Sequence, residues 1–357
     1  MYEIKELTEK NRADAEIVIK ARFPLSALNV LDKVMSNPLC DEHKGFGEIL
    51  YIDSKPVAFR AALRRRLFKG QREVLARVRG LTCRLVDSPK DSISKLVEAQ
   101  KVNLRGCIMA ISNTQCVPTE KRAILNGATL GPETCKRFVW RAIRPLKCIV
   151  HFVRRKILKM QPQKETAFNT LGALGFTIDI GELKIRRVEI SGIDFFDRLM
   201  KRYLSTNVGF VSSRSAEEIE WIYGKGMRDG SVVALCAEDD VGPVGYLILK
   251  SDRACVRWLL GDMLVVNNQQ DIMRVLLKSA CCFLKRHTPA MMLESIGFSE
   301  FADSTIREFM PHERKCDANF DSFNFFCEKE ECELNKLLLS DKSWFFGPYD
   351  GDMCLDE

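Results

Sequence analysis

The spacing of apolar and polar residues changes several times along the chain, and each change marks an expected element. Residues 2–7 alternate one by one, which is typical of a half-buried strand. Residues 92–101 place apolar side chains three and four positions apart, which indicates a helix. The sequence Asp-Ser-Lys-Pro at 53–56 favours a turn between two strand-like stretches. The pattern therefore predicts a mixed α/β protein.

The same order of elements is expected twice: helix, helix, hairpin, strand, helix, strand, helix. In the first half these elements are expected at 13–22, 25–35, 47–68, 73–86, 92–101, 106–112 and 119–126, followed by a closing strand at 138–143. In the second half they are expected at 195–204, 216–222, 231–250, 256–266, 271–286, 290–296 and 301–310. This repetition predicts two similar α/β halves.

Short sequence matches support the repetition. Residues 50–53 and 56–59 resemble residues 235–238 and 243–246. Because residue identity is low, the order of the elements is the main argument, and the alternative is that mixed α/β chains repeat such runs by chance. We expect domains at 1–145 and 191–357, joined by a basic and polar linker at 146–190 that contains a helix.

Length and composition are those of an ordinary globular protein. The chain has 357 residues, enough for two domains, with 46% hydrophobic and 29% charged residues. We find no secretory signal and no apolar run near the roughly 20 residues that span a bilayer. The 14 Cys are scattered, which favours reduced thiols in apolar cores. These features predict a cytoplasmic protein.

The net charge of +7 is unevenly distributed, with the cations concentrated at 60–79 and 136–159. Residues 136–159 interleave cations with aromatic and aliphatic side chains, so peripheral contact with an anionic membrane surface is one interpretation. A closing strand followed by a packed linker helix is the other, and the sequence favours it. The cations at 60–72 would attract a phosphate-bearing ligand or coat an exposed hairpin. Nucleic-acid binding is not expected, since no reader motif is present.

A family resemblance rests on four segments and their order. They are Arg-Phe-Pro at 22–24 with Ser-Asn-Pro at 36–38, Arg-Phe-Val-Trp-Arg-Ala-Ile-Arg-Pro at 137–145, Glu-Ile-Glu-Trp-Ile-Tyr at 218–223, and Trp-Phe-Phe at 344–346 with Tyr-Asp-Gly-Asp at 349–352. Together they resemble tandem N-acyltransferases of the GNAT superfamily, of the kind encoded with bacterial surface-polysaccharide genes. The resemblance covers nearly the whole chain and implies two tandem GNAT-like acyl-CoA N-acyltransferase folds.

In that family the donor's pyrophosphate lies on backbone N–H groups at the start of the helix after the fourth strand. The usual motif is Gln/Arg-x-x-Gly-x-Gly/Ala, and neither half retains it. The first half has Ser92-Ile93-Ser94 in place of Gly-x-Gly, followed by Lys95. The resemblance makes these four residues the expected site for acetyl-CoA or another acyl-CoA, with ordinary helix capping as the alternative. In the second half Asp271 would repel a phosphate, which favours capping there.

Acyl transfer to an amine requires a base and an N–H group that polarises the carbonyl. Asp262, inside the apolar run 260–264, is the best candidate base; the alternative is a bulge or turn after Gly261. The tyrosine acid of the family is missing from both 119–126 and 301–310. Tyr349 would substitute if the tail folds back, and Asp350 and Asp352 would then hold an amine or sugar hydroxyls. A solvated tail is the alternative.

The leading hypothesis is an N-acyltransferase that uses a CoA thioester and a small-molecule amine or a sugar-linked acceptor. An amino sugar of a surface polysaccharide is the acceptor that the resemblance suggests. The alternatives are a binding or scaffold protein that has lost the cofactor motif, and a Fem-type transferase that uses aminoacyl-tRNA. No metal is expected, because the spacing of His312, Cys316, Cys327 and Cys332 is poor for zinc.

Overall fold

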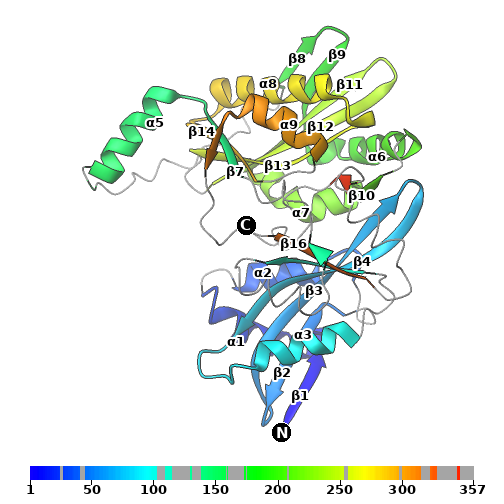
Figure 1. Cartoon of the computed structure of the whole chain (residues 1–357), viewed down its shortest axis with the longest axis vertical. Coiled ribbons are helices and arrows are strands. Elements are labelled where there is room, and N and C mark those ends of the chain that lie inside the picture. Colours follow the sequence, from blue (N-terminus) through cyan, green and yellow to red (C-terminus); the bar gives the residue numbers. More distant parts are fainter. Residues whose placement is uncertain are drawn as a thin grey trace. The chain divides into compact units, whose positions relative to one another are not determined.

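The computed structural model describes residues 1–24, 27–40, 45–102, 109–114, 129–130, 138–157, 159, 173, 175–206, 209–252, 256–296, 300–314, 322–327 and 344–345. Contacts divide the chain into two compact units. The first unit combines Met1–Gly131 with Asp321–Ser340 and Tyr349–Glu357, and the second combines Pro132–Phe320 with Asp341–Pro348. Figure 1 labels many of their helices and strands.

The first unit is built on a mostly antiparallel sheet, in which β4 and β5 run parallel. The strands follow one another across it in the order β1-β2-β3-β4-β5-β16-β6. Its elements are β1 (Tyr2–Glu6), a 3-10 turn (Glu9–Asn11), α1 (Arg12–Lys20), α2 (Ala27–Met35), β2 (Gly47–Ile52), β3 (Lys55–Lys69), β4 (Arg72–Arg84), α3 (Ser92–Val102), β5 (Met109–Thr114), β6 (Thr129–Leu130) and β16 (Ser322–Cys327).

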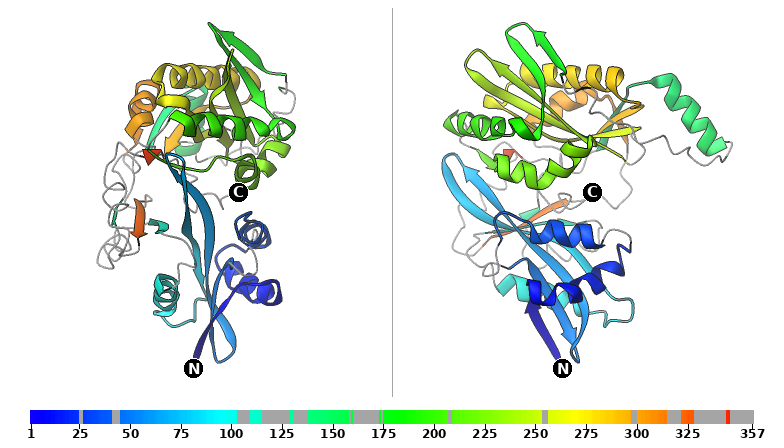
Figure 2. Two further views of the ribbon diagram at one scale, coloured as in Figure 1. Left: turned by 90° about the vertical axis from the view of Figure 1, so that its right-hand side faces the viewer. Right: turned by 180° about the vertical axis from the view of Figure 1, so that it is seen from behind.

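Helices cover both faces of this sheet, with α1 and α2 on one face and α3 on the other (Figure 2). The hairpin expected at 53–56 is confirmed. Asp53 and Ser54 have φ of 48° and 63°, the left-handed pair of a type I′ turn, whose twist matches that of the flanking strands. On the α3 side Leu96 packs with Leu50 and Ala58, and all three are fully buried. This packing fixes the start of α3 against the sheet.

Gly47 at the start of β2 lies where β2 and β3 approach closely. A Cβ added there would lie 2.5 Å from the backbone oxygen of Arg60. We expect Gly47→Ala to lower the free energy of unfolding by about 1–3 kcal/mol, because backbone atoms must move apart. Thermal unfolding followed by circular dichroism measures this. Gly175→Ala is the control, since its Cβ would meet no atom within 4 Å; equal melting temperatures for the two variants would contradict the expectation.

The second unit is built on an eight-stranded sheet in the order β15-β7-β14-β13-β12-β11-β9-β8, in which only β13 and β14 pair in parallel among the described strands. The short strands β10 and β17 pair in parallel. The elements are β7 (Phe138–Ala142), α5 (Pro145–Phe152), a π-helical turn (Val153–Ile157), β8 (Thr177–Ile180), β9 (Leu183–Val188), a 3-10 turn (Ile190–Gly192), α6 (Asp194–Thr206), β10 (Phe210–Ser212), α7 (Ala216–Asp229), β11 (Val232–Asp239), β12 (Gly242–Ser251), β13 (Arg257–Val265), a 3-10 turn (Val266–Asn268), α8 (Gln270–His287), β14 (Met292–Ile296), α9 (Glu300–Phe309), β15 (His312–Arg314) and β17 (Trp344–Phe345).

Helix α7 shows how local chemistry and packing set an element. It begins after Ser215, whose side chain accepts a hydrogen bond from the backbone N–H of Glu218. The helix expected at 216–222 continues to Asp229 and ends at Gly230, which has φ of 83°. Gly226 is required inside it, since a Cβ there would lie 2.4 Å from Val232 Cγ2. A glycine that looks like a helix breaker therefore permits close packing on β11.

One strand in each sheet comes from a distant part of the chain. Strand β7, expected to close the first half, lies between β14 and β15 in the second unit. Strand β16, from near the other end of the sequence, lies between β5 and β6 in the first unit. The two strands occupy matching places, each next to the strand that pairs in parallel. The compact units are therefore discontinuous in sequence.

The two sheets share irregularities of strand register. The β2–β3 ladder passes over Val57, and the β11–β12 ladder passes over Val244. Each skipped residue is the second residue of the matched segments 56–59 and 243–246. The match of 50–53 with 235–238 is displaced by two residues, because the register equates Leu50 with Ala237.

A second irregularity recurs one ladder further on. In the β3–β4 ladder Gly80 and Leu81 are both unpaired opposite Ala61. In the β12–β13 ladder Gly261 is unpaired. In both sheets this bulge comes directly after the last residue that pairs in parallel, which is Arg79 in β4 and Leu260 in β13.

Candidate functional site

Each sheet contains a fork, defined here as the point where the two parallel strands separate. In the first unit Ala76–Arg79 of β4 pair with Met109–Ser112 of β5. Beyond these residues β4 pairs only with β3, as far as Arg84, and β5 pairs only with β16, as far as Thr114. In the second unit β13 and β14 separate after Leu260. The separated strand edges present backbone N–H and C=O groups, which an extended ligand with amide groups can satisfy.

The bulge at each fork turns the backbone of the longer strand. A β-bulge bends its strand and re-aims the groups next to it, which is why bulges often adjoin active sites. In the second unit the bulge residue Gly261 precedes Asp262. In the first unit the corresponding bulge at Gly80 precedes Leu81. The two forks therefore share a bulge, but the residue after the bulge glycine is Asp262 in the second unit and Leu81 in the first.

The residues expected to bind a cofactor, 92–95, lie together in the first turn of α3. Ser92 is fully buried, and its Oγ has no hydrogen-bond partner among the described residues. The Lys95 ammonium lies 2.9 Å from an Asp91 carboxylate oxygen and 4.6 Å from the centre of the Tyr2 ring. Hydrogen bonding to Lys95 lowers the Asp91 pKa. The positive charge of Lys95 is therefore already engaged within the protein.

Backbone N–H groups at this helix start are the more useful feature. The Ser92 N–H donates to Pro89 O (3.1 Å) and the Lys95 N–H to Asp91 O (3.0 Å). Between them, the N–H groups of Ile93 and Ser94 have no acceptor within the described ranges. Unpaired N–H groups at the positive end of a helix are a general binding site for anions. Ile93 and Ser94 could therefore hold a phosphate through their backbone.

The start of α8 has a different character. Asp271 lies in the first turn with its side chain almost fully exposed, and Arg274 pairs with it at 2.9 Å. Arg274 also pairs with Glu308 of α9 at 3.0 Å. Met273, also in the first turns of α8, is fully buried. A carboxylate at the helix start opposes a phosphate, so α8 is the weaker of the two anion sites.

Asp262 is buried and saturated with hydrogen bonds. Its Oδ2 accepts from the Tyr246 hydroxyl (2.6 Å) and from Arg214 Nε (3.2 Å). Its Oδ1 accepts from Arg214 Nη2 (3.2 Å) and from the Met263 backbone N–H (2.9 Å). A carboxylate offers about four acceptor positions, and here all four are filled. Deprotonating a substrate amine would require one of these bonds to break.

Arg214 and Tyr246 are site residues that were not expected from the sequence. Arg214 is buried and also donates to the carbonyl of Ser212 at 2.8 Å. Burial, and then the Asp262 charge, raise the pKa of Tyr246 well above its ordinary value, so its phenol stays protonated. One signal was available, because a carboxylate inside an apolar strand needs a buried cationic partner. The sequence does not say which cation that is.

The other expected catalytic residues, Tyr349, Asp350 and Asp352, lie outside the described residues. Within the described ranges no group of three or more His, Cys, Asp or Glu side chains is placed to hold a metal ion. None of the described helices is long and apolar enough to cross a membrane.

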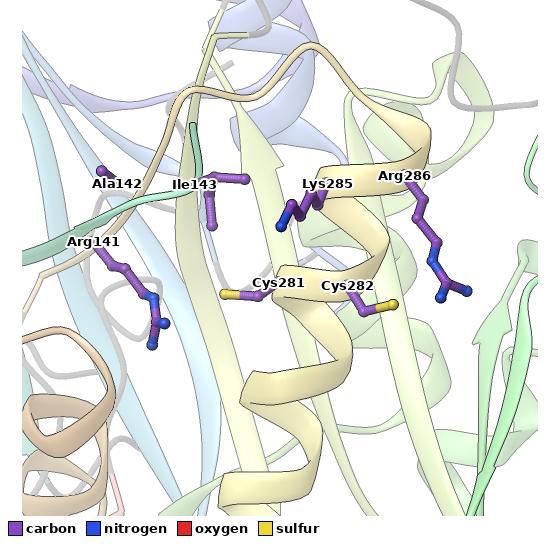
Figure 3. A pocket seen from close by; sticks show the side chains of 7 residues that line it. All are labelled: Arg141, Ala142, Ile143, Cys281, Cys282, Lys285 and Arg286. Atoms are coloured by element: carbon purple, nitrogen blue, oxygen red, sulfur yellow. The ribbon is translucent and has the colours of Figure 1, made fainter. Parts of the chain in front are cut away.

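A cationic pocket lies beside the C-terminal half of α8 (Figure 3). Its volume is about 540 Å³, and it is lined by Arg141, Ala142, Ile143, Cys281, Cys282, Lys285 and Arg286. Burial raises the pKa of the Cys281 thiol to about 11, so this thiol stays protonated near neutral pH. Cys281 follows the first turn of α8 by about 15 Å at 1.5 Å per residue. The pocket is therefore distinct from the start of α8.

No protein-family model and no curated protein match this sequence. Solved structures do match, over nearly the whole chain. A GCN5-related N-acetyltransferase from Kribbella flavida has a TM-score of 0.57 at 11% identity, covering 92% of this chain and 71% of its own. A probable N-acyltransferase from Enterococcus faecalis V583 has a TM-score of 0.58 at 11% identity, covering 90% and 72%.

The N-myristoyltransferase of Saccharomyces cerevisiae, solved with bound myristoyl-CoA, also matches. Its TM-score is 0.55 at 12% identity, covering 91% of this chain and 79% of its own. Identities this low establish the fold alone. The chain has the mixed α/β fold of GNAT-type N-acetyltransferases and N-acyltransferases, as the order of elements predicted.

Proposed function

We propose that this protein is an N-acyltransferase that moves an acyl group from a CoA thioester to an amine, with the donor held by the first unit. The supporting observation is the combination of the β4–β5 fork with the unpaired N–H groups of Ile93 and Ser94 at the start of α3. The pantetheine arm of CoA is extended and contains amide groups, which suit an unpaired strand edge. Its pyrophosphate suits the helix start.

The proposed reaction needs little from side chains. The neutral amine attacks the thioester carbonyl, the C–N bond forms, and the C–S bond breaks. The amine proton passes to a base or to water, and the leaving thiolate takes up a proton. A backbone N–H at the Gly80 bulge would polarise the carbonyl oxygen, since a bulge leaves such groups out of the ladder.

The finer parts of the proposal concern the two halves and the acceptor. The matching register irregularities support a tandem repeat with one copy in each compact unit, although the strands of 138–142 and 177–188, expected in the first copy and in the linker, lie in the second sheet. The acceptor would be a small-molecule amine or a sugar-linked amine, such as an amino sugar of a bacterial surface polysaccharide. A cytoplasmic location is consistent with many scattered cysteines.

The acid–base residues are also part of the proposal. Tyr349, with Asp350 and Asp352, is proposed as the group that protonates the thiolate and holds the acceptor. Arg214 and Tyr246 already occupy the carboxylate oxygens of Asp262. Asp262 is therefore proposed to position these two side chains at the fork of the second unit. Acetyl-CoA or a longer acyl-CoA would be the donor.

Thermal stability in the presence of CoA, acetyl-CoA and a long-chain acyl-CoA tests the proposal. A ligand at 100 times its Kd stabilises the folded state by about 2.7 kcal/mol, so the melting temperature should rise by several degrees. Mass spectrometry of the thioester with a panel of amines then tests turnover. The absence of both stabilisation and amine-dependent thioester consumption would overturn the proposal.

A binding or scaffold protein is the second candidate. Asp271 at the start of α8 favours it, since a carboxylate makes that helix start unsuited to a phosphate. CoA binding without turnover, or no CoA binding at all, is the result that this candidate predicts.

A further inference from the structure

Helix α5 stands apart from the sheet of its own unit (Figures 1 and 2). None of its residues is buried. Its exposed apolar side chains, with the exposed percentage of each, are Leu146 (79%), Ile149 (60%), Val150 (50%) and Phe152 (58%), and Ile157 (65%) follows in the next turn. So many large apolar side chains on one exposed helix indicate a surface that meets something apolar.

The apolar residues form a stripe. Leu146, Ile149 and Val150 follow the three-and-four spacing that places side chains on one face of a helix. Lys147 is exposed and flanks this stripe, about 60° around the helix from Val150 at 100° per residue, and Arg154 is exposed in the π-helical turn that follows. The segment is therefore amphipathic, with cations beside an apolar stripe.

The charge of the segment has one sign. Residues 138–159 contain Lys or Arg at 141, 144, 147, 154, 155, 156 and 159, and they contain no Asp or Glu. A surface that combines an apolar stripe with cations alone is complementary to an anionic surface that covers an apolar layer.

The start of α5 is fixed beside the cationic pocket. Arg144 donates from Nη2 to the backbone oxygens of Lys285 (2.6 Å) and Thr288 (2.8 Å). The Cys148 thiol lies 3.2 Å from the Met291 carbonyl oxygen. Lys285 itself lines the pocket together with Arg286. The helix and the pocket cations therefore belong to one continuous surface of the second unit.

We propose that α5 and this pocket dock the protein onto an anionic lipid bilayer. The apolar stripe lies among the acyl chains, while Lys147, Arg154 and the pocket cations Lys285 and Arg286 contact the headgroups. A second copy of the chain fits this surface poorly, because it would bring cations against cations. The proposal does not depend on acyltransferase activity, and the packed linker helix favoured by the sequence does not account for the exposure of α5.

Co-sedimentation of the full chain with vesicles tests the proposal. We expect binding to phosphatidylcholine vesicles that contain phosphatidylglycerol, at least ten-fold weaker binding to pure phosphatidylcholine, and a decrease with rising salt. The pair Leu146→Asp and Ile149→Asp should abolish binding, and the pair Lys147→Glu and Arg154→Glu should weaken it at least ten-fold.

Matched controls separate docking from general effects. Val241→Asp changes an equally exposed apolar residue at the β11–β12 turn, and Lys201→Glu changes an exposed cation on α6. Both should bind as the unaltered chain does. Because all altered side chains of α5 are exposed, the melting temperature should not change.

Equal binding to the two kinds of vesicle, or unaltered binding by the α5 variants, would overturn the proposal. A concentration-dependent dimer in sedimentation velocity that Leu146→Asp abolishes, without vesicle binding, would assign the face to a second copy and overturn it as well. Capture by an acidic polypeptide without vesicle binding would likewise replace the lipid with a protein partner.

Discussion

Replacing Asp262 with alanine is expected to lower the free energy of unfolding of the second unit by about 3–5 kcal/mol. The Arg214 guanidinium would then stay buried without the carboxylate that accepts two of its hydrogen bonds. The Tyr246 hydroxyl would lose its acceptor in the same step. Few single substitutions have so large an effect, because few leave a buried charge without its partner.

Tryptophan fluorescence in urea measures this change selectively. All four Trp, at 140, 221, 258 and 344, belong to the second unit, and Trp258 is fully buried. The double variant Asp262→Leu with Arg214→Met removes both charges and should recover part of the loss. A variant Asp262→Ala that unfolds like the unaltered protein, yet loses all transferase activity, would instead make Asp262 the catalytic base.

Replacing Ser94 with aspartate is expected to weaken CoA binding at least about ten-fold, or 1.4 kcal/mol, without destabilising the protein. The new carboxylate would sit in the first turn of α3 beside the unpaired N–H groups of Ile93 and Ser94. There it would repel the pyrophosphate. An acidic residue in the first turn favours the helix itself, so the melting temperature should stay equal or rise slightly.

Isothermal titration with CoA measures the change in affinity, and Asp271→Asn on α8 is the matched control. That variant removes a carboxylate from the first turn of the other candidate helix. If the donor binds the first unit, Asp271→Asn leaves the Kd unchanged. Tighter binding by Asp271→Asn, with normal binding by Ser94→Asp, would place the donor on α8 and contradict the proposal.

Local signals in the sequence predicted most of the individual elements. The helix expected at 271–286 is α8, and the hairpin expected at 231–250 is β11 with β12, since amphipathic spacing and turn chemistry act within a few residues. The hairpin of β8 and β9 was missed, because its residues fell within the expected linker. The placement of β7 was missed for another reason. Five residues can form a strand anywhere, and only long-range pairing decides which sheet they join.

The parts of the candidate site that depend on local backbone structure were predictable from the sequence. The hydrogen-bond partners of its side chains were less predictable. The helix start at Ser92 follows from the spacing of the apolar residues after it, and the structure places residues 92–95 together there. Asp262 stood out as a carboxylate in an apolar strand, and the alternative of a bulge after Gly261 is also observed. The engagement of Asp262 by Arg214 was not predictable, because 48 residues separate the two in the chain.

The position of β16 has a consequence for how the nascent chain folds. Ribosomes make β5 and β6 early, but the strand that lies between them, Ser322–Cys327, is made only after the strands β7 to β15 of the second unit. Until then the edge of β5 that pairs with β16 is open to wrong partners, including other nascent chains. Completion of the first sheet therefore waits until the strands β7 to β15 of the second unit have been made, and slow elongation or early termination before β16 would expose an unfinished sheet to aggregation.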